Sequence, residues 1–194
     1  GYFALFIAYF PQLVACPIER SHHLQHQLKE EHKFDYQRGA EGFRLMLWGF
    51  FKKLVIADNL AVVVDLAYNN PIEKNGWFLL FATYCFAFQI LCDFSGYTDI
   101  ARGAAQIMGV NLMENFQRPY FAKTVQEFWQ RWHISLSTWF RDYVYVPLCG
   151  SRTPSLSRRL FAVMVVFMLS GIWHGANWTF LVWGALNGIF YLAQ

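Results

Sequence analysis

The segments LFAVMVVFML at residues 160–169 and TFLVWGALNGIFYL at residues 179–192 are strongly apolar, and GIWHGANW at residues 171–178 lies between them. Both apolar segments predict membrane helices, so His174 is expected at or inside the apolar layer. A charged side chain there costs about 2.5–3.5 kcal/mol on insertion scales, and such residues usually mark a pathway or a reactive site. Histidine also takes and returns a proton near neutral pH. His174 is therefore the first candidate catalytic residue; the alternative is a turn histidine held by the neighbouring tryptophans at the membrane interface.

The composition of the chain is that of a membrane protein. Of the 194 residues, 56% are hydrophobic and 15% are charged, whereas about 25% are charged in an ordinary soluble domain. The net charge of +3 comes without a stripe of Lys and Arg, so nucleic acid is not an expected partner. Four cysteines include no C-x-x-C pair, and Cys85 and Cys92 are expected to pack as small hydrophobic residues.

Both ends of the chain fall inside apolar segments, and Gly1 is preceded by no initiator Met. The start of the sequence has neither the charged segment nor the cleavage site of a signal peptide. We therefore expect residues 1–194 to form part of a single membrane-bound domain that is truncated at both ends.

In the first half of the chain, apolar helices are predicted to alternate with polar connections. Residues 19–41 predict a loop with a short surface helix, placed on the cytoplasmic side by its basic residues. The same segment contains three histidines with H-H-x-x-H spacing. An i,i+4 pair could bind zinc, but no further ligand is evident, so we predict solvated histidines and no metal site. These histidines are His22, His23 and His26.

Residues 43–68 have a helical pattern but carry Lys52, Lys53, Asp58 and Asp65, so they are expected to be interfacial, tilted or packed inside a bundle. Within this segment, Lys52 and Lys53 are expected to extend their charged ends to the interface.

Residues 77–92 are the clearest span upstream of the central region. A turn is predicted at Gly96, with Asp93 and Asp99 capping helices at the membrane edge, and a short helix is predicted over residues 97–110.

In the second half, a break is predicted at residues 118–120, and residues 124–146 predict an aromatic helical segment that ends at Pro147. The basic loop 150–159 is again assigned to the cytoplasmic side. Irregular polar backbone at membrane depth is tolerated only within protein or around a cavity. The predicted fold is all-α: a multi-pass transmembrane helical bundle, with tilted, interfacial and broken helices around a membrane-embedded chamber.

A second polar group lies within residues 124–146. On a helix, His133, Ser137 and Arg141 fall at positions i, i+4 and i+8 and form one polar stripe. The stripe offers a base, a hydroxyl and a cation, which suits an acyl-carrying or anionic ligand. Arg131 and Arg141 can contact a phosphate-bearing donor, or extend to lipid headgroups, and His133 can equally make a structural hydrogen bond.

Four motifs carry a resemblance to a known family. FWQRWHISLSTWFRDYVYVPL (residues 128–148) and LSGIWHGANWTFLVWGALNG (169–188) resemble the two signature regions of the membrane-bound O-acyltransferase family. PQLVACPIER (11–20) and ILCDFSGYTDIARG (90–103) are similar to upstream motifs of its bacterial alginate O-acetylation branch. The resemblance implies that the chain belongs to a multi-pass protein of the bacterial inner (plasma) membrane.

The resemblance also implies which residues act. His174, in the WHG motif, corresponds to the family's essential histidine, and His133 corresponds to a second histidine of this branch. Cys16 and Cys149 stand where the branch usually has Gly, and a side chain would strain a close backbone approach there.

The implied reaction is O-acyl transfer from a thioester donor such as acetyl-CoA, with no other cofactor. A periplasmic or extracellular acetyltransferase partner would complete acylation of a polysaccharide such as alginate. A neutral His174 would act as general base, which is worth roughly 10²–10⁴-fold, and His133 would orient the donor or share the proton. Asn177, or backbone N–H groups near Gly175, would stabilise the oxyanion, and Trp173 would help to bind substrate with Ser137 and Arg141.

Three other functions stay open. The same chemistry could serve another acceptor, as in teichoic acid D-alanylation or in lipid or protein acylation. A proton-coupled transporter would use buried histidines differently, but corresponding interrupted helices in two halves are expected there and no internal repeat is found. A structural scaffold would gain nothing from a histidine within the membrane.

Overall fold

The computed structural model describes residues 1–12, 17–150 and 155–193; Cys16 and Arg152 lie outside the described residues. Within the described ranges the regular structure is helical, and the β-type pairing is a single bridge between Phe116 and Trp132. The prediction of an all-α chain is therefore confirmed. The helices form two compact units, Gly1–Glu114 and Asn115–Gln194.

The first unit begins with short helices that pack on the connection following the longest helix. α1 (Tyr2–Ala8) and the 3₁₀ turn η1 (Phe10–Gln12) precede α2 (Ser21–Gln27), which is the predicted short surface helix. The buried Glu19 carboxylate accepts a hydrogen bond from the backbone N–H of Met113 at 2.6 Å. The Gln27 amide exchanges two further hydrogen bonds with the Asn111 backbone. The polar segment is thus tied to the end of the main helical hairpin.

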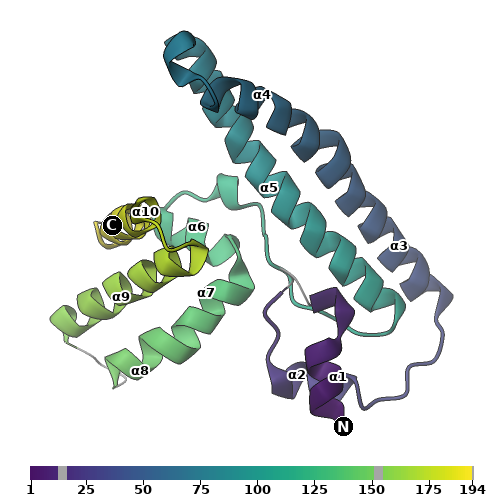
Figure 1. Cartoon of the computed structure of the whole chain (residues 1–194). Coiled ribbons are helices and arrows are strands. Elements are labelled where there is room, and N and C mark those ends of the chain that lie inside the picture. The colour runs from purple at the N-terminus through teal and green to yellow at the C-terminus, as the bar shows by residue number, and fades with distance from the viewer. Residues whose placement is uncertain (13–16, 151–154, 194) are drawn as a thin grey trace. The chain divides into compact units, whose positions relative to one another are not determined.

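That hairpin consists of two long helical arms (Figure 1). One arm is α3 (Tyr36–Phe50), the π-helical segment η2 (Phe51–Ala57) and α4 (Asp58–Tyr68), which follow one another without interruption. The other arm is α5 (Gly76–Ile107), which lies beside the first. The helical pattern predicted for residues 43–68 is confirmed. The predicted turn at Gly96 is wrong, because α5 continues through it.

Gly96 serves close helix packing rather than a turn. A Cβ atom on Gly49 of α3 would lie 2.6 Å from the Gly96 carbonyl oxygen, and one on Gly42 would lie 2.7 Å from the Gly103 carbonyl oxygen. Glycine is costly inside a helix, but here it lets two backbones touch at points seven residues apart. Small residues commonly permit this approach between membrane helices.

The charged residues of the hairpin pair with one another across its arms. Lys52 Nζ lies 2.6 Å from Asp99 Oδ2 and donates to Ser95 Oγ at 3.0 Å. Lys53 Nζ lies 2.7 Å from Asp58 and 2.9 Å from Asp93. The predictions that Lys52 reaches the interface and that the two aspartates cap helices are therefore wrong, whereas the Lys53 side chain is 40% exposed. Asp93 and Asp99 are interior residues of α5, where each balances a lysine of the opposite arm.

The second unit begins with a break and several short helices. Arg118 adopts a left-handed backbone conformation (φ 49°) before the 3₁₀ turn η4 (Pro119–Phe121), as the predicted break requires. The following elements are α6 (Val125–Arg131), α7 (Ile134–Phe140), the π-helical turn η5 (Arg141–Tyr145) and α8 (Val146–Cys149).

The prediction of one helical segment over residues 124–146 is wrong, because the chain breaks at Trp132 and His133 between α6 and α7. Pro147 does not end the segment either. It stands in the first turn of α8, where a missing N–H is tolerated.

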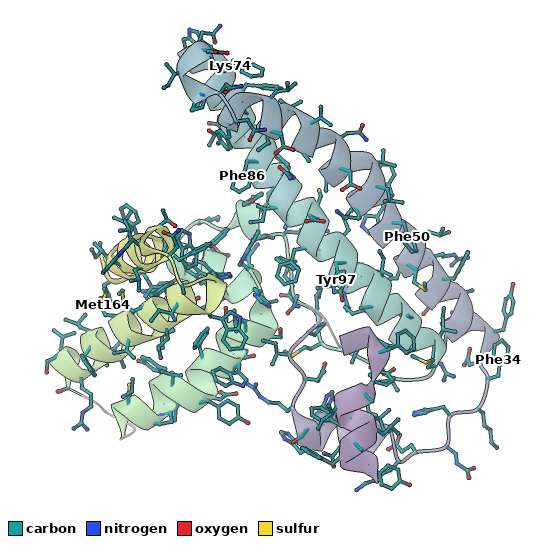
Figure 2. The ribbon with its side chains drawn as sticks, viewed as in Figure 1. Phe34, Phe50, Lys74, Phe86, Tyr97 and Met164 are labelled. Carbon is teal, nitrogen blue, oxygen red and sulfur yellow. The ribbon has the colours of Figure 1, made fainter. Side chains whose placement is uncertain are left out.

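α9 (Leu156–His174) and α10 (Trp178–Leu192) form the last hairpin. A Cβ atom on Gly184 would lie 2.5 Å from the Phe167 carbonyl oxygen, and one on Gly188 would lie 2.8 Å from Met164 Sδ, so these helices also touch closely. α5 and α9 are long and apolar enough to cross a membrane, and α10 is a shorter apolar helix. Many large apolar side chains are exposed. Phe50 and Phe86, labelled in Figure 2, are examples, and each is more than two-fifths exposed.

Candidate active site

The first half of the site is built around the helix break at His133. His133 has a left-handed backbone conformation (φ 44°, ψ 55°), which is uncommon for a residue other than glycine. It is the N-cap residue of α7, yet its side chain makes no capping hydrogen bond. The imidazole is half-buried and lines a cavity. A strained residue that faces a cavity is a typical feature of a functional site.

The second half of the site is the end of α9, where His174 is the last helical residue. Its ring lies 5.2 Å from the ring of Trp183 in an edge-on arrangement and 6.3 Å from that of Phe180. The chain then turns at Gly175, and Asn177 caps α10 by accepting a hydrogen bond from the Thr179 N–H at 3.1 Å. The tight turn and the aromatic contacts fix His174 at the mouth of the hairpin.

A cavity of about 790 Å³ within the second unit brings the two halves together. Four predicted site residues line it: His133, Ser137, Arg141 and His174. The polar stripe predicted on one helix is thus reproduced on one cavity wall, although His133 precedes the helix that carries Ser137. Trp173 and Asn177 are not among the lining residues. Trp173 is exposed, and the Asn177 side chain caps α10.

The backbone groups proposed for the oxyanion already have partners. The Gly175 N–H donates to the Ile172 carbonyl at 3.2 Å, and the Asn177 N–H donates to the Gly175 carbonyl at 2.9 Å. In this conformation both N–H groups serve the turn, so an oxyanion would need other donors or a rearrangement of the turn.

His133 is uncharged, whereas the nearby arginines are charged and paired with carboxylates. Burial lowers the pKa of His133 to about 4, with a smaller contribution from the nearby His174. His133 is therefore neutral at physiological pH and exchanges hydrogen bonds as an uncharged group. Arg141 Nε pairs with Asp142 Oδ1 at 2.9 Å, and Arg131 pairs with Glu127. Both arginines predicted to contact a phosphate have a carboxylate partner.

Several polar lining residues were missed by the sequence analysis, among them Tyr145, Arg159 and Ser170. Ser170 precedes His174 by four residues on α9, so helical spacing alone could have placed it on the same face. Arg159 lies in a basic segment that was interpreted only as a sign of membrane orientation. Burial raises the pKa of Tyr145, which interacts with Cys149 and Arg159.

Cys149 has an ordinary helical backbone conformation. It is buried in α8 and has no left-handed backbone conformation, whereas Gly150, the next residue, has φ 68°. The strained position is thus still occupied by a glycine. Cys16 lies outside the described residues.

In the described part of the chain, no group of three or more histidine, cysteine or acidic side chains could hold a metal ion. His23 pairs with Glu19 at 3.0 Å, and His26 pairs with Glu30 at 3.1 Å. These two histidines of the H-H-x-x-H segment therefore contact local carboxylates.

The fold and the site define an all-helical chain with candidate membrane spans and two histidines on one cavity. The model of the MBOAT, or membrane-bound O-acyltransferase, family matches residues 2–194. The chain belongs to the membrane-bound O-acyltransferase family.

Relatives with curated names differ in the acyl acceptor. The chain is 45% identical over 192 residues to a probable alginate O-acetylase of Pseudomonas fluorescens, an alignment that covers 96% of this chain and 37% of the relative. It is 39% identical to a peptidoglycan O-acetyltransferase of Helicobacter pylori (96% and 36%) and 32% identical to a teichoic acid D-alanyltransferase of Bacillus subtilis (95% and 49%). The chain therefore spans between about a third and a half of the length of these relatives.

Proposed function

We propose that the protein is an O-acyltransferase of the bacterial inner membrane. It moves an acetyl group from a cytoplasmic thioester donor such as acetyl-CoA toward hydroxyl groups of an extracytoplasmic polysaccharide such as alginate. The observation that carries the proposal is that His133 and His174, from separate segments, line one cavity. Two imidazoles on one cavity can handle the proton of an attacking hydroxyl group, which O-acyl transfer requires.

His174 is the general base in this proposal. As the acceptor oxygen attacks the thioester carbonyl, His174 takes the hydroxyl proton and a carbon–oxygen bond forms. The tetrahedral intermediate then collapses, the carbon–sulfur bond breaks, and the proton passes to the leaving thiolate. The acceptor is either the polysaccharide itself or a partner protein that carries the acyl group onward.

His133 assists as a neutral group. Because its pKa is about 4, it does not carry a proton into the reaction at neutral pH. It can accept or donate one hydrogen bond, and so orient the donor thioester or steady His174. Ser137 and Arg141 line the same cavity and are proposed to contact the donor.

The polysaccharide acceptor is supported by the relatives. The name of the Pseudomonas fluorescens relative specifies alginate O-acetylation, and the Helicobacter pylori relative is named for acetylation of another glycan. A D-alanyl donor with a teichoic acid acceptor is the second candidate, favoured by the name of the Bacillus subtilis relative. The multi-pass arrangement around a chamber and an extracytoplasmic acetyltransferase partner belong to the proposal as well.

The test compares the full-length protein with its H174Q and H133Q variants in the host, at matched membrane levels. Ester-linked acetate on the secreted polysaccharide is measured after mild alkaline release. We expect H174Q to abolish it and H133Q to reduce it strongly. H22Q is the matched control, because His22 is an exposed residue of α2.

Full acetylation by H174Q would overturn the proposal. If acetate is absent even with the wild-type protein, D-alanine esters on cell-wall polymers are measured in the same strains. Their dependence on His174 would replace the acetyl proposal with the second candidate.

A further inference from the structure

The His133 side chain does not cap the first turn of α7. The N-cap side chain of a helix ordinarily accepts a hydrogen bond from a backbone N–H of the first turn. His133 makes no such bond, and its left-handed conformation is one that only surrounding structure can hold. Another part of the chain must therefore cap α7 and stabilise the break.

Asn115 supplies hydrogen-bond acceptors for two backbone N–H groups in the first turn of α7. Its backbone carbonyl accepts a hydrogen bond from the Ile134 N–H at 3.0 Å, and its side-chain Oδ1 accepts one from the Ser135 N–H at 3.1 Å. These are the first two N–H groups of α7. Asn115 is 1% exposed, and Ser135 is fully buried. A residue 18 positions earlier thus takes the place of the N-cap side chain.

The segment after Asn115 holds the other side of the break. The Gln117 N–H donates to the Arg131 carbonyl at 3.0 Å, and the Phe116 ring meets the Trp132 ring edge-on at 5.0 Å. The residues on both sides of His133 are therefore attached to the same short segment. This attachment leaves the His133 side chain to line the cavity.

We propose that Asn115 is a positioning residue that caps α7 in place of His133 and so holds the His133 imidazole on the cavity wall. The inference rests on the proposed function. Asn115 is not among the residues that line the cavity, so it acts through His133 and not on the substrate.

The amide oxygen of Asn115, and not its nitrogen, carries this role. Within the described residues, the buried Nδ2 of Asn115 has no hydrogen-bond partner. Aspartate has nearly the same shape, and burial keeps its carboxyl protonated, so it retains an acceptor oxygen and N115D should largely preserve the arrangement. Leucine has a similar size but no acceptor, so N115L should lose it. Serine is a milder change that is too short to reach the Ser135 N–H.

The experiment measures initial rates of acetyl transfer by the full-length protein in membranes with acetyl-CoA as donor. We expect N115L and N115S to lower kcat at least tenfold with KM for the donor changed less than twofold, and N115D to keep at least a third of kcat. In an H133Q background, N115L should change kcat less than twofold, because its effect passes through His133. N75L is the matched control, since Asn75 caps α5 by the same kind of bond to the Phe78 N–H.

An equal loss of kcat from N115L with and without His133 would overturn the inference, as would an N115D variant no better than N115L. A second readout does not depend on activity: the rate at which diethylpyrocarbonate modifies His133, relative to exposed His22, followed by mass spectrometry. N115S should change that ratio several-fold and N75L should not. If the wild-type protein transfers no acetyl group, the proposed function fails, and an unchanged ratio would separately overturn the role of Asn115.

Discussion

Replacement of Asp99 by Asn should destabilise the first unit far more than replacement of its partner Lys52 by Met. The two side chains are only 14% and 13% exposed, and their charged atoms lie 2.6 Å apart. Asp99 has a second cation within reach, since Arg102 Nη1 lies 3.5 Å from its other oxygen. Besides its pairing with Asp99, the Lys52 ammonium donates a hydrogen bond to the neutral hydroxyl of Ser95. The two halves of the pair are thus unequally supported.

The expected magnitudes follow from what each variant leaves behind. D99N leaves the buried Lys52 charge uncompensated, and breaking a buried pair in this way costs about 3–5 kcal/mol. K52M leaves Asp99 beside Arg102, so we expect a loss of roughly 1–2 kcal/mol, the order of a charged hydrogen bond. The double variant K52M/D99N removes both charges and should recover to within about 1 kcal/mol of wild type, because apolar replacements of buried pairs are often neutral.

The assay is thermal unfolding of the full-length protein in detergent, followed by the fraction that remains monodisperse after heating. D58N is the control, because it tests the same chemistry at an exposed pair: the Asp58 side chain is 46% exposed, and the expected change is below about 1 kcal/mol. If K52M proved as damaging as D99N, or if the double variant showed the sum of the two losses, the account of an unequally supported buried pair would be refuted.

Three further outcomes are expected. G49A should lower the free energy of unfolding by about 1–3 kcal/mol, because its Cβ would lie 2.6 Å from the Gly96 carbonyl oxygen. G76A is the control, because a Cβ there meets nothing within 4 Å. Thermal unfolding of the detergent-solubilised protein compares the two variants. Acidification from pH 7.5 to 5 should lower the free energy of unfolding by about 2 kcal/mol through His133. The unfolded chain binds a proton at this residue below about pH 6.5, whereas the folded chain does so only near pH 4. An equal acid sensitivity in H133Q would contradict this. T124A should cost about 1 kcal/mol, because the Thr124 hydroxyl caps α6, and circular dichroism melting measures the loss.

The sequence predicted helices well wherever local pattern and local chemistry agree. The apolar runs that become α9 and α10, the short helix in residues 19–41 and the break at Arg118 are all present. It failed at Gly96 for a physical reason. Glycine predicts a turn when only its own flexibility is considered, but the same missing side chain allows a carbonyl of α3 to touch α5. Which backbone packs against a glycine depends on the tertiary structure, and the local sequence pattern does not reveal it.

The charged residues of the hairpin were misplaced for the same reason. Lysines and aspartates in an apolar segment predict an interfacial position when each is considered alone. Lys52 and Asp99 are 47 positions apart and neutralise each other once the arms of the hairpin lie side by side. Pairing removes the need for either charge to reach water, so both residues can lie in the interior of long helices.

The candidate site shows most clearly where sequence reasoning stops. Helical spacing grouped His133, Ser137 and Arg141, and the three do line one cavity, but the helix that carries Ser137 begins only after His133, which has a left-handed backbone conformation. A continuous helix through His133 would have satisfied its backbone and fixed its side chain by the neighbouring turns. At the break, hydrogen bonds to Asn115 replace those local bonds. The imidazole can therefore take a direction that a continuous helix would not allow. The local sequence favours the helix, so the break exists only because a distant segment stabilises it, and a site built in this way is sensitive to residues that never touch its substrate.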